Sequence, residues 1–202
     1  MKLHGHPLSS CTRKVKLTLA EKGAEAEFVL VDLFKGAHKS EAHLARHPFG
    51  VVPVLDDDGF VLYESRAIIR YLDTRLDGPS LVPSSPKDAA RMNQWMSVDQ
   101  SYIAPHTRAL AVERVVKKHG ADAQVVEAAE KALRTAFTVL DRALASSDYL
   151  AGRAFSLADV SLMPYVASLP MIDAEHTRRD LPRLAAWWAR VSERPAWKRA
   201  LG

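Results

Sequence analysis

The sequence predicts an α/β plus all-α protein, a small α/β domain followed by a helical domain, and three observations support this. Residues 1–77 contain short apolar runs typical of strands, with amphipathic helical patterns between them. Residues 78–85 are rich in Gly, Pro and Ser, as linkers are. Beyond them, in residues 86–202, apolar residues recur at the three- and four-residue spacings of helices. We therefore expect one domain before this linker and one after it.

The first elements follow in the order strand, helix, strand. The segments 2–5 ("KLHG") and 28–31 ("FVLV") are predicted strands. Between them Cys11, Val15 and Leu19 recur every four residues, which predicts a helix with one buried face. A helix that joins two such strands makes a parallel crossover. We expect Cys11 to lie in the core as a small apolar residue rather than to act as a nucleophile.

A hairpin and a second helix complete the N-terminal domain. In residues 51–65, "VVPVLDDDGFVLYES", an Asp-Asp-Asp-Gly turn separates two apolar runs, which is typical of a β-hairpin. After it, Ile68, Leu72 and Leu76 share one helical face. The Gly-Pro pair at the start of the linker should end this helix.

The helical domain carries signals for helix starts and for one helix break. Ser85 precedes a proline and, three positions on, an acid, so it is predicted to cap a helix. That helix should bend or break before Pro105, which cannot donate a backbone hydrogen bond. Ser156 and Asp159 have the spacing of a capping box. We therefore assign Asp159 a structural role and exclude it from the active site.

Composition and charge argue against several classes of function. The 28 basic and 24 acidic residues form no basic block interleaved with aromatics, so nucleic-acid binding is not expected. A single cysteine excludes an internal disulfide and suits a reducing compartment. No signal-peptide core or membrane-spanning apolar run occurs, and the eight histidines show no metal-ligand spacing. We expect a cytoplasmic protein with no metal, membrane or nucleic-acid partner.

Four stretches resemble motifs of the glutathione S-transferase family, in order and over nearly the whole chain. They are "GHPLSSCTRKV", "GAHKSEAHLARHPFG", "VPVLDDDGFVLYESRAIIRYL" and "AGRAFSLADVSLMPYV". The patterns are most similar to the phi-like class. The "SSC" segment is also similar to the zeta class, but Glu64 stands where zeta members typically have Gln. The resemblance implies a thioredoxin-like N-terminal domain and an all-helical C-terminal domain that contributes a pocket for a hydrophobic co-substrate.

The resemblance places the family's catalytic serine at Ser9. The reactive form of glutathione is the thiolate, whereas a free thiol has a pKa of about 8.5. A helix N-terminus offers unpaired N–H groups and partial positive charge, and a hydroxyl can add one hydrogen bond to the sulfur. Outside the family motif, Ser9 or Ser10 would be interpreted as an ordinary helix cap.

Two further motifs are implied to bind the middle and the γ-glutamyl end of glutathione. In the family, Pro53 follows a cis peptide bond, and the main chain of Val52 pairs with the cysteinyl backbone. Ser65 is expected to cap the third helix, whose N–H groups would receive a carboxylate. Glu64 would lie beside the ammonium group. Without the motifs, these pairs would be an ordinary strand start and helix start.

The remaining site residues are implied by the same resemblance. His38 and Lys39 would oppose the glycine carboxylate of glutathione, with Lys39 the more important because it is charged at neutral pH. Phe34 and Tyr102 would line the pocket of the hydrophobic co-substrate. Val51 stands where the phi-like pattern usually has Gln, so this chain lacks one polar contact at that position.

The implied function is transfer of the glutathione thiolate to small hydrophobic electrophiles. The implied assembly is a homodimer, with Phe49 as a candidate contact. Two alternatives stay open: a zeta-like glutathione-dependent cis–trans isomerase, suggested by "SSC", and a non-catalytic ligand-binding module of the same fold, suggested by Val51. Glutathione would be a co-substrate, and no metal is expected.

Overall fold

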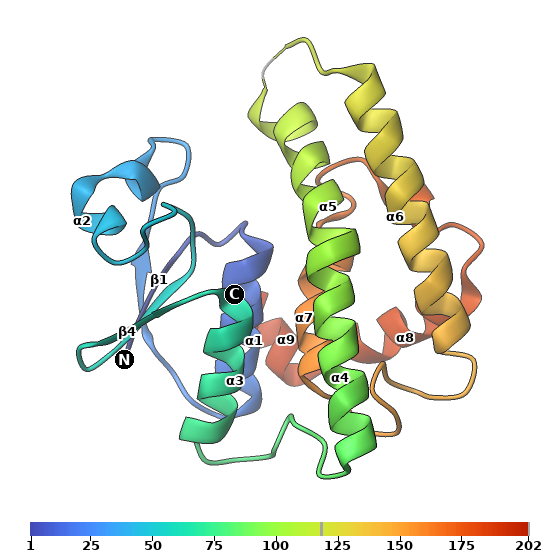
Figure 1. The fold of residues 1–202 in the computed structure, drawn as a ribbon, viewed down its shortest axis with the longest axis horizontal. Coiled ribbons are helices and arrows are strands. Elements are labelled where there is room, and N and C mark those ends of the chain that lie inside the picture. Colours follow the sequence, from blue (N-terminus) through green and yellow to red (C-terminus); the bar gives the residue numbers. More distant parts are fainter. Residues whose placement is uncertain (118, 202) are drawn as a thin grey trace. The chain divides into compact units, whose positions relative to one another are not determined.

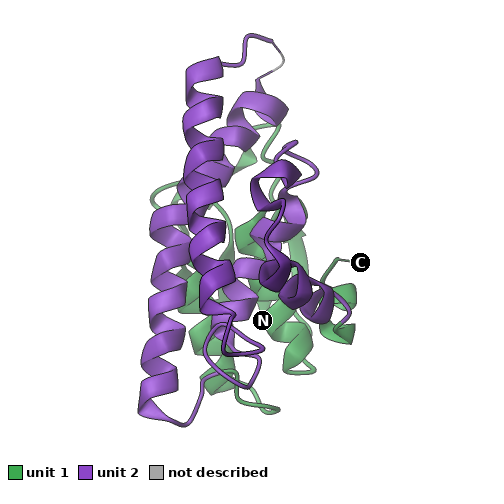
Figure 2. Cartoon of the chain, turned by 90° about the vertical axis from the view of Figure 1, so that its right-hand side faces the viewer, with its two compact units in different colours: residues 1–81, 194–202 green, residues 82–193 purple. Residues whose placement is uncertain are grey.

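A computed structural model describes residues 1–117 and 119–201 and divides the chain into two compact units (Figure 2). The first unit is Met1–Leu81 together with the end of the chain from Arg194, and the second is Val82–Glu193. The chain end therefore belongs to the first unit, whereas our sequence division places it in the helical domain. The reason is packing: helix α9 (Pro195–Leu201) buries Trp197 and Ala200 and lies against α1 (Ser10–Glu21).

The first unit contains a four-stranded sheet with strand order β2-β1-β3-β4. The strands are β1 (Lys2–Gly5), β2 (Glu27–Leu30), β3 (Val54–Asp57) and β4 (Phe60–Tyr63). Strand β1 is parallel to β2, while β3 is antiparallel to both β1 and β4. The predicted crossover and hairpin are both confirmed.

Helices cover both faces of this sheet. Figure 1 shows α1 and α3 (Ser65–Arg75) side by side on one face and α2 (Glu41–Leu44) on the other. Helix α1 approaches β1 very closely at Gly5, where an added Cβ would lie 2.5 Å from Cγ2 of Thr12. Only glycine allows this approach, which brings the start of α1 onto the end of β1.

The prediction that Cys11 lies in the core is wrong, because this side chain is only half-buried. The buried face of α1 begins instead at Thr12 and continues through Val15 and Leu19. The close contact with β1 decides this rotation of the helix. Thr12 faces the strand, and its Oγ1 accepts a hydrogen bond from the backbone N–H of His6 at 3.3 Å.

Among the described residues, the regular structure of the second unit is helical, apart from one isolated β-bridge between Tyr149 and Gly152. Its α-helices are α4 (Pro86–Val98), α5 (Ala104–Ala111), α6 (Ala123–Ala143), α7 (Leu157–Ser168) and α8 (Pro182–Ser192). It also contains two π-helical turns, η2 (Asp99–Ile103) and η3 (Val112–Val116), and one 3₁₀ turn, η4 (Glu175–Arg178). The predicted break before Pro105 is the π-helical turn η2, a widened turn typical of an interrupted hydrogen-bond ladder.

Helix α7 forms the centre of this unit. The predicted capping box at its start is confirmed, with Ser156 and Asp159 both fully buried. One oxygen of Asp159 also accepts from the indole Nε1 of Trp187 at 2.8 Å and from the N–H of Leu150 at 3.1 Å. In the part of the chain that is described, no helix combines the length and apolar character that crossing a membrane requires.

Candidate active site

The topology of the sheet brings the predicted site segments to one edge. Strand β1 ends at Gly5, beside Leu30 at the end of β2. Strand β3 begins at Val54, which pairs with His4 of β1 and with Tyr63 at the end of β4. The segments that follow β1, precede β3 and follow β4 therefore meet at this edge. They carry, in that order, Ser9, the pair Val52-Pro53 and the pair Glu64-Ser65.

Ser9 is the N-cap of α1. Its Oγ accepts a hydrogen bond from the backbone N–H of Thr12 at 3.3 Å, and its own N–H donates to the carbonyl of His6 at 3.0 Å. Arg13 fixes the same loop, since its Nε donates to the carbonyl of Pro7 at 2.8 Å. Because the cap uses a lone pair of the hydroxyl, its proton remains available to a further acceptor.

The peptide bond between Val52 and Pro53 is cis. Within residues 1–117 and 119–201, neither the N–H nor the C=O of the buried Val52 has a hydrogen-bond partner. Buried backbone groups are nearly always paired, so this residue presents a donor and an acceptor suited to another backbone. The preceding residue is fixed, because Nε2 of His43 lies 2.8 Å from the carbonyl oxygen of Val51.

Helix α3 begins without a side-chain cap. Its N-cap is Glu64, with φ 71° and ψ 106°, and this residue makes no side-chain capping hydrogen bond within the described part of the chain. The prediction that Ser65 caps this helix is wrong. The chain reverses at Glu64, and the buried Ser65 is already the first helical residue. A positive φ at a residue other than glycine costs of order 1–3 kcal/mol and is concentrated at functional sites.

The loop with His38 and Lys39 is attached to the segment before Val51. The ammonium of the exposed Lys39 donates to the carbonyl of Phe49 at 3.1 Å. Next to it, Gly50 has φ 59°, and an added Cβ would lie 2.8 Å from the carbonyl oxygen of His38. Partial burial is the main influence that lowers the pKa of His38, and the positive charge of Lys39 lowers it further. The ring is therefore neutral at neutral pH.

His47 lies beside this site and was missed by our reading of the sequence. The ring is 1% exposed and stacks on Tyr63, with centroids 4.6 Å apart. Burial lowers the pKa of His47, against the opposing influence of Glu64. The spacing of His43 and His47 by four residues, within one motif, is the signal that could have indicated a shared face. Among the described residues, no group of three or more His, Cys, Asp or Glu is placed to hold a metal.

Phe34 and Tyr102 belong to different units. Phe34 follows β2 and is 65% exposed, and its ring meets His6 edge-on at 5.6 Å, close to the loop of Ser9. Tyr102 is 61% exposed and lies in the π-helical turn η2 of the helical unit. Their shared role in one pocket stays a prediction.

Comparison with known families agrees with this arrangement. Residues 8–75 match the family model "Glutathione S-transferase, N-terminal domain", and residues 103–195 match "Glutathione S-transferase, C-terminal domain". The chain belongs to the glutathione S-transferase family. The predicted phi-like class and the predicted fold of this transferase are confirmed with it.

Relatives match this transferase along almost its full length. It is 42% identical over 198 residues to glutathione S-transferase PM239X14 of Arabidopsis thaliana, with 94% of this chain and 90% of the relative covered. The crystal structure of glutathione transferase F7 from Populus trichocarpa superposes with a TM-score of 0.91 at 34% identity, covering 98% and 96% of the two chains. The structure of glutathione S-transferase-I bound with lactoylglutathione superposes with a TM-score of 0.88 at 28% identity, covering 99% and 97%.

Proposed function

We propose that this transferase binds glutathione at the sheet edge described above and transfers its sulfur to hydrophobic electrophiles. The observation that carries the proposal is the start of α1. There, Ser9 caps the helix through its oxygen and keeps its hydroxyl proton for another acceptor. The relative bound with lactoylglutathione supports a glutathione-type ligand at this fold. The unpaired backbone of Val52 and the uncapped start of α3 give two further places for polar groups of a tripeptide.

Ser9 would stabilise the thiolate rather than remove its proton. Within the described part of the chain, no histidine or carboxylate is hydrogen-bonded to its hydroxyl, so nothing there would make Ser9 a base or a nucleophile. Its proton can be donated to sulfur, and the α1 N-terminus adds partial positive charge. A thiol pKa lowered by one to two units corresponds to roughly 1.4–2.7 kcal/mol.

The reaction itself needs little further help from the protein. The thiol releases its proton to solvent, and the thiolate forms a sulfur–carbon bond with the electrophile. With a chloronitroarene, the carbon–chlorine bond breaks and chloride leaves with the bonding electron pair. Holding both reactants in one site makes the encounter effectively unimolecular, which contributes to the rate.

The other predicted residues would hold the rest of glutathione. The main chain of Val52 would pair with the cysteinyl backbone, with Pro53 fixing the direction of the chain. The N–H groups at the start of α3, from Ser65 onward, would receive the γ-glutamyl carboxylate, and Glu64 its ammonium. Lys39, with His38 beside it, would oppose the glycine carboxylate. Its bond to Phe49 uses one of three ammonium protons and leaves two.

The electrophile would bind in a pocket to which the helical domain contributes. Phe34 and Tyr102 are the aromatic side chains we assign to it. Both side chains are more than half exposed, so their rings are accessible to an apolar molecule. Replacing either residue by Ala should then raise KM for the electrophile more than KM for glutathione.

The decisive experiment compares Ser9→Ala with Ser10→Ala, a matched change one residue along. We expect Ser9→Ala to lower kcat for 1-chloro-2,4-dinitrobenzene by about 10- to 100-fold, the loss that 1.4–2.7 kcal/mol implies, with little change in the affinity for glutathione. The ultraviolet band of bound thiolate should shift to higher pH in this variant only. Undiminished turnover in Ser9→Ala would contradict the assignment. No thiolate band at neutral pH in the unaltered protein would favour a non-catalytic module.

We also propose that the transferase forms a homodimer and acts in the cytoplasm. Phe49 is 70% exposed although its ring lies edge-on to His47 and Tyr63, so the loop holds a large apolar side chain outward. Such an aromatic is suited to a pocket of a second copy. Sedimentation velocity should give a dimeric mass that Phe49→Ser shifts toward the monomer. A monomeric mass for the unaltered protein would exclude this assembly.

A further inference from the structure

The segment that joins α2 to β3 carries the backbone of Val52 and leads into the sheet at Val54. Within the described chain, residues 51 and 52 make one hydrogen bond, which joins Nε2 of His43 to the carbonyl oxygen of Val51 at 2.8 Å. Since a carbonyl oxygen can only accept, Nε2 carries the proton of this ring. One side chain therefore holds the backbone immediately before Val52.

His43 is itself held in place by its surroundings. It lies in α2, where its N–H donates to Oγ of the N-cap residue Ser40 at 3.3 Å. The side chain is 5% exposed, and its ring stacks on the buried ring of His47, with centroids 6.4 Å apart and planes inclined by 22°. A closely packed ring of this kind has little freedom to rotate. Its donor nitrogen therefore keeps one direction, toward the Val51 carbonyl.

The bond to Val51 also fixes the N–H of Val52. The carbonyl of one residue and the N–H of the next belong to one planar peptide unit, and in the trans form they point in opposite directions. The peptide bond between Val51 and Val52 is trans. Because His43 holds the Val51 oxygen toward α2, the Val52 N–H points away from α2. That N–H has no partner within the described residues.

We propose that His43 is a positioning residue for glutathione. Through the carbonyl of Val51, it aims the N–H of Val52 at the cysteinyl carbonyl of the tripeptide. This role rests on the proposed function, which assigns the main chain of Val52 to the cysteinyl backbone. His43 acts only through Val51, so it is not a catalytic residue.

Such a role affects binding rather than the chemical step. The pairing with Val52 is the same before and during the transfer of sulfur, so its loss raises KM for glutathione and leaves kcat nearly unchanged. The loss of the Ser9 hydroxyl has the opposite pattern, a lower kcat with little change in affinity. The two assignments can therefore be tested separately in one set of assays.

The test compares His43→Phe, which keeps a buried aromatic ring and removes the donor, with His43→Gln, whose amide nitrogen can donate from a similar position. Calorimetric titration of the full chain with S-hexylglutathione should show about fivefold weaker binding for His43→Phe. Its kcat for 1-chloro-2,4-dinitrobenzene and the pH at which the thiolate band appears should be unchanged. His43→Gln should recover the affinity to within about twofold of the unaltered protein. Near-ultraviolet circular dichroism shows whether each variant is folded, and His43→Leu gives the same comparison if His43→Phe is not.

An altered ligand tests the aimed N–H directly. In an analogue of S-hexylglutathione whose cysteinyl–glycine amide is replaced by a trans alkene, the cysteinyl carbonyl is absent. The Val52 N–H then has no acceptor on the ligand, so the unaltered protein and His43→Phe should bind this analogue with affinities within about twofold of each other. A general disturbance of the first unit would instead weaken the binding of both ligands alike.

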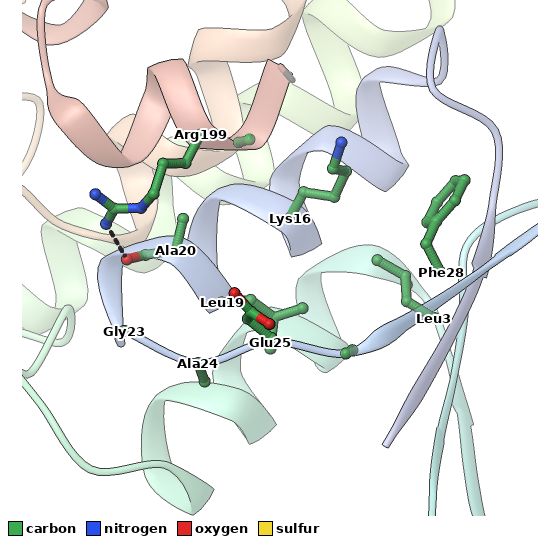
Figure 3. Close-up of a pocket in the computed structure, with 11 residues that line it drawn as sticks. Leu3, Lys16, Leu19, Ala20, Gly23, Ala24, Glu25, Phe28 and Arg199 are labelled. Atoms are coloured by element: carbon green, nitrogen blue, oxygen red, sulfur yellow. Dashed lines mark hydrogen bonds between the residues drawn. The ribbon is translucent and has the colours of Figure 1, made fainter.

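Arg199→Leu is the matched control. Arg199 also donates to a backbone carbonyl, that of Ala20 at 2.8 Å. It lines a pocket of about 450 Å³ at the opposite end of α1 from Ser9 (Figure 3). We expect Arg199→Leu to bind S-hexylglutathione with an affinity within about twofold of the unaltered protein, because this bond does not hold the segment of Val52.

Unchanged affinity for S-hexylglutathione in the folded His43→Phe or His43→Leu variant would overturn the role of His43 and leave the proposed function standing. So would an equal loss in Arg199→Leu, a failure of His43→Gln to recover the affinity, or an equal loss for the alkene analogue. An unaltered protein that does not bind S-hexylglutathione would instead contradict the proposed function, and the role of His43 with it.

Discussion

Two helix starts in this protein differ in how their N–H groups are satisfied. Helix α7 begins at the fully buried Ser156, which accepts from Ala158 and forms a complete capping box with Asp159. Helix α3 begins at the exposed Glu64, which has φ 71° and no side-chain cap. The first start is closed by its own side chains, whereas the second has no side-chain cap, which suits a bound anion.

The capped start of α7 stabilises the fold, whereas the uncapped start of α3 is suited to binding a ligand. At α7, one carboxylate accepts from Leu150, Ser156 and Trp187, so it joins two loops and a second helix to one helix start. At α3, backbone strain is tolerated, and no side-chain hydrogen bond caps the helix start among the residues that the structure describes. Strain and unused polar groups are typical of sites that bind ligands, whereas complete satisfaction is typical of a core.

The largest effect is expected at the closed helix start. Asp159→Asn should lower the free energy of unfolding by about 3 kcal/mol, because an amide nitrogen cannot accept the hydrogen bonds that one carboxylate oxygen now receives. Asp88→Asn is the matched control: it makes the same change three residues after the cap Ser85 of an exposed helix start, and should cost less than about 1 kcal/mol. Urea denaturation measures both. Equal losses would mean that burial does not distinguish these capping positions.

The open helix start should respond in the opposite direction. Glu64→Gly removes the strain of positive φ and should raise the free energy of unfolding by about 1 kcal/mol, after the entropy cost of glycine. It should also weaken binding of S-hexylglutathione by about tenfold, since it removes the carboxylate that we propose to face the γ-glutamyl ammonium.

The control for that variant is Asp58→Gly, another acid with positive φ, at the β3–β4 turn. Calorimetric titration should show its affinity for S-hexylglutathione within twofold of the unaltered protein. If both variants lose affinity alike, the effect comes from glycine in the first unit and not from the carboxylate of Glu64.

A smaller effect is expected at the exposed cap of α4. Ser85 accepts from the N–H of Asp88 at 3.4 Å, a long bond at the surface. Ser85→Ala should therefore cost about 0.5–1 kcal/mol in urea denaturation. Ser156→Ala should cost more, because the buried hydroxyl also bonds to Asp159. A larger loss of stability in Ser85→Ala than in Ser156→Ala would contradict the distinction between buried and exposed caps.

The smallest effect is expected in the pH dependence of stability. Burial lowers the pKa of His47, so between that value and the ordinary histidine value of about 6.5 the unfolded chain binds more protons than the folded one. The contribution of His47 is therefore complete above this window and is lost as the pH falls through it. His47→Phe should flatten the dependence below pH ~6.5, whereas the exposed His119→Gln should not. Urea denaturation at several pH values gives the slopes, and equal slopes would exclude His47 as the cause.

Local patterns predicted most of the architecture, but they did not predict helix rotation. The strand at 2–5, the hairpin turn and the capping box at Ser156 depend on neighbouring residues and could be identified from sequence. The rotation of α1 depends on the contact between Gly5 and Thr12, which a four-residue repeat does not contain. Cys11 was therefore placed in the core although it is half-buried.

The candidate site divides in the same way. The motifs located Ser9 and Glu64 along the chain, because residue type and spacing are properties of the sequence. The cap at Glu64 rather than Ser65, the unpaired backbone of Val52 and the stacking of His47 on Tyr63 appear only in the folded chain.

The sequence by itself determined the order of the main elements, the family and the caps of α4 and α7, since these follow from propensity, period and motif. Only the tertiary structure decided which helix starts have buried side-chain caps and which backbone groups, such as those of Val52, have no hydrogen-bond partner among the described residues. Hydrogen-bond satisfaction and burial depend on groups far apart in the chain, such as Asp159 and Trp187. Residues with the same local pattern, such as Ser85 and Ser156, can therefore have different roles in one protein.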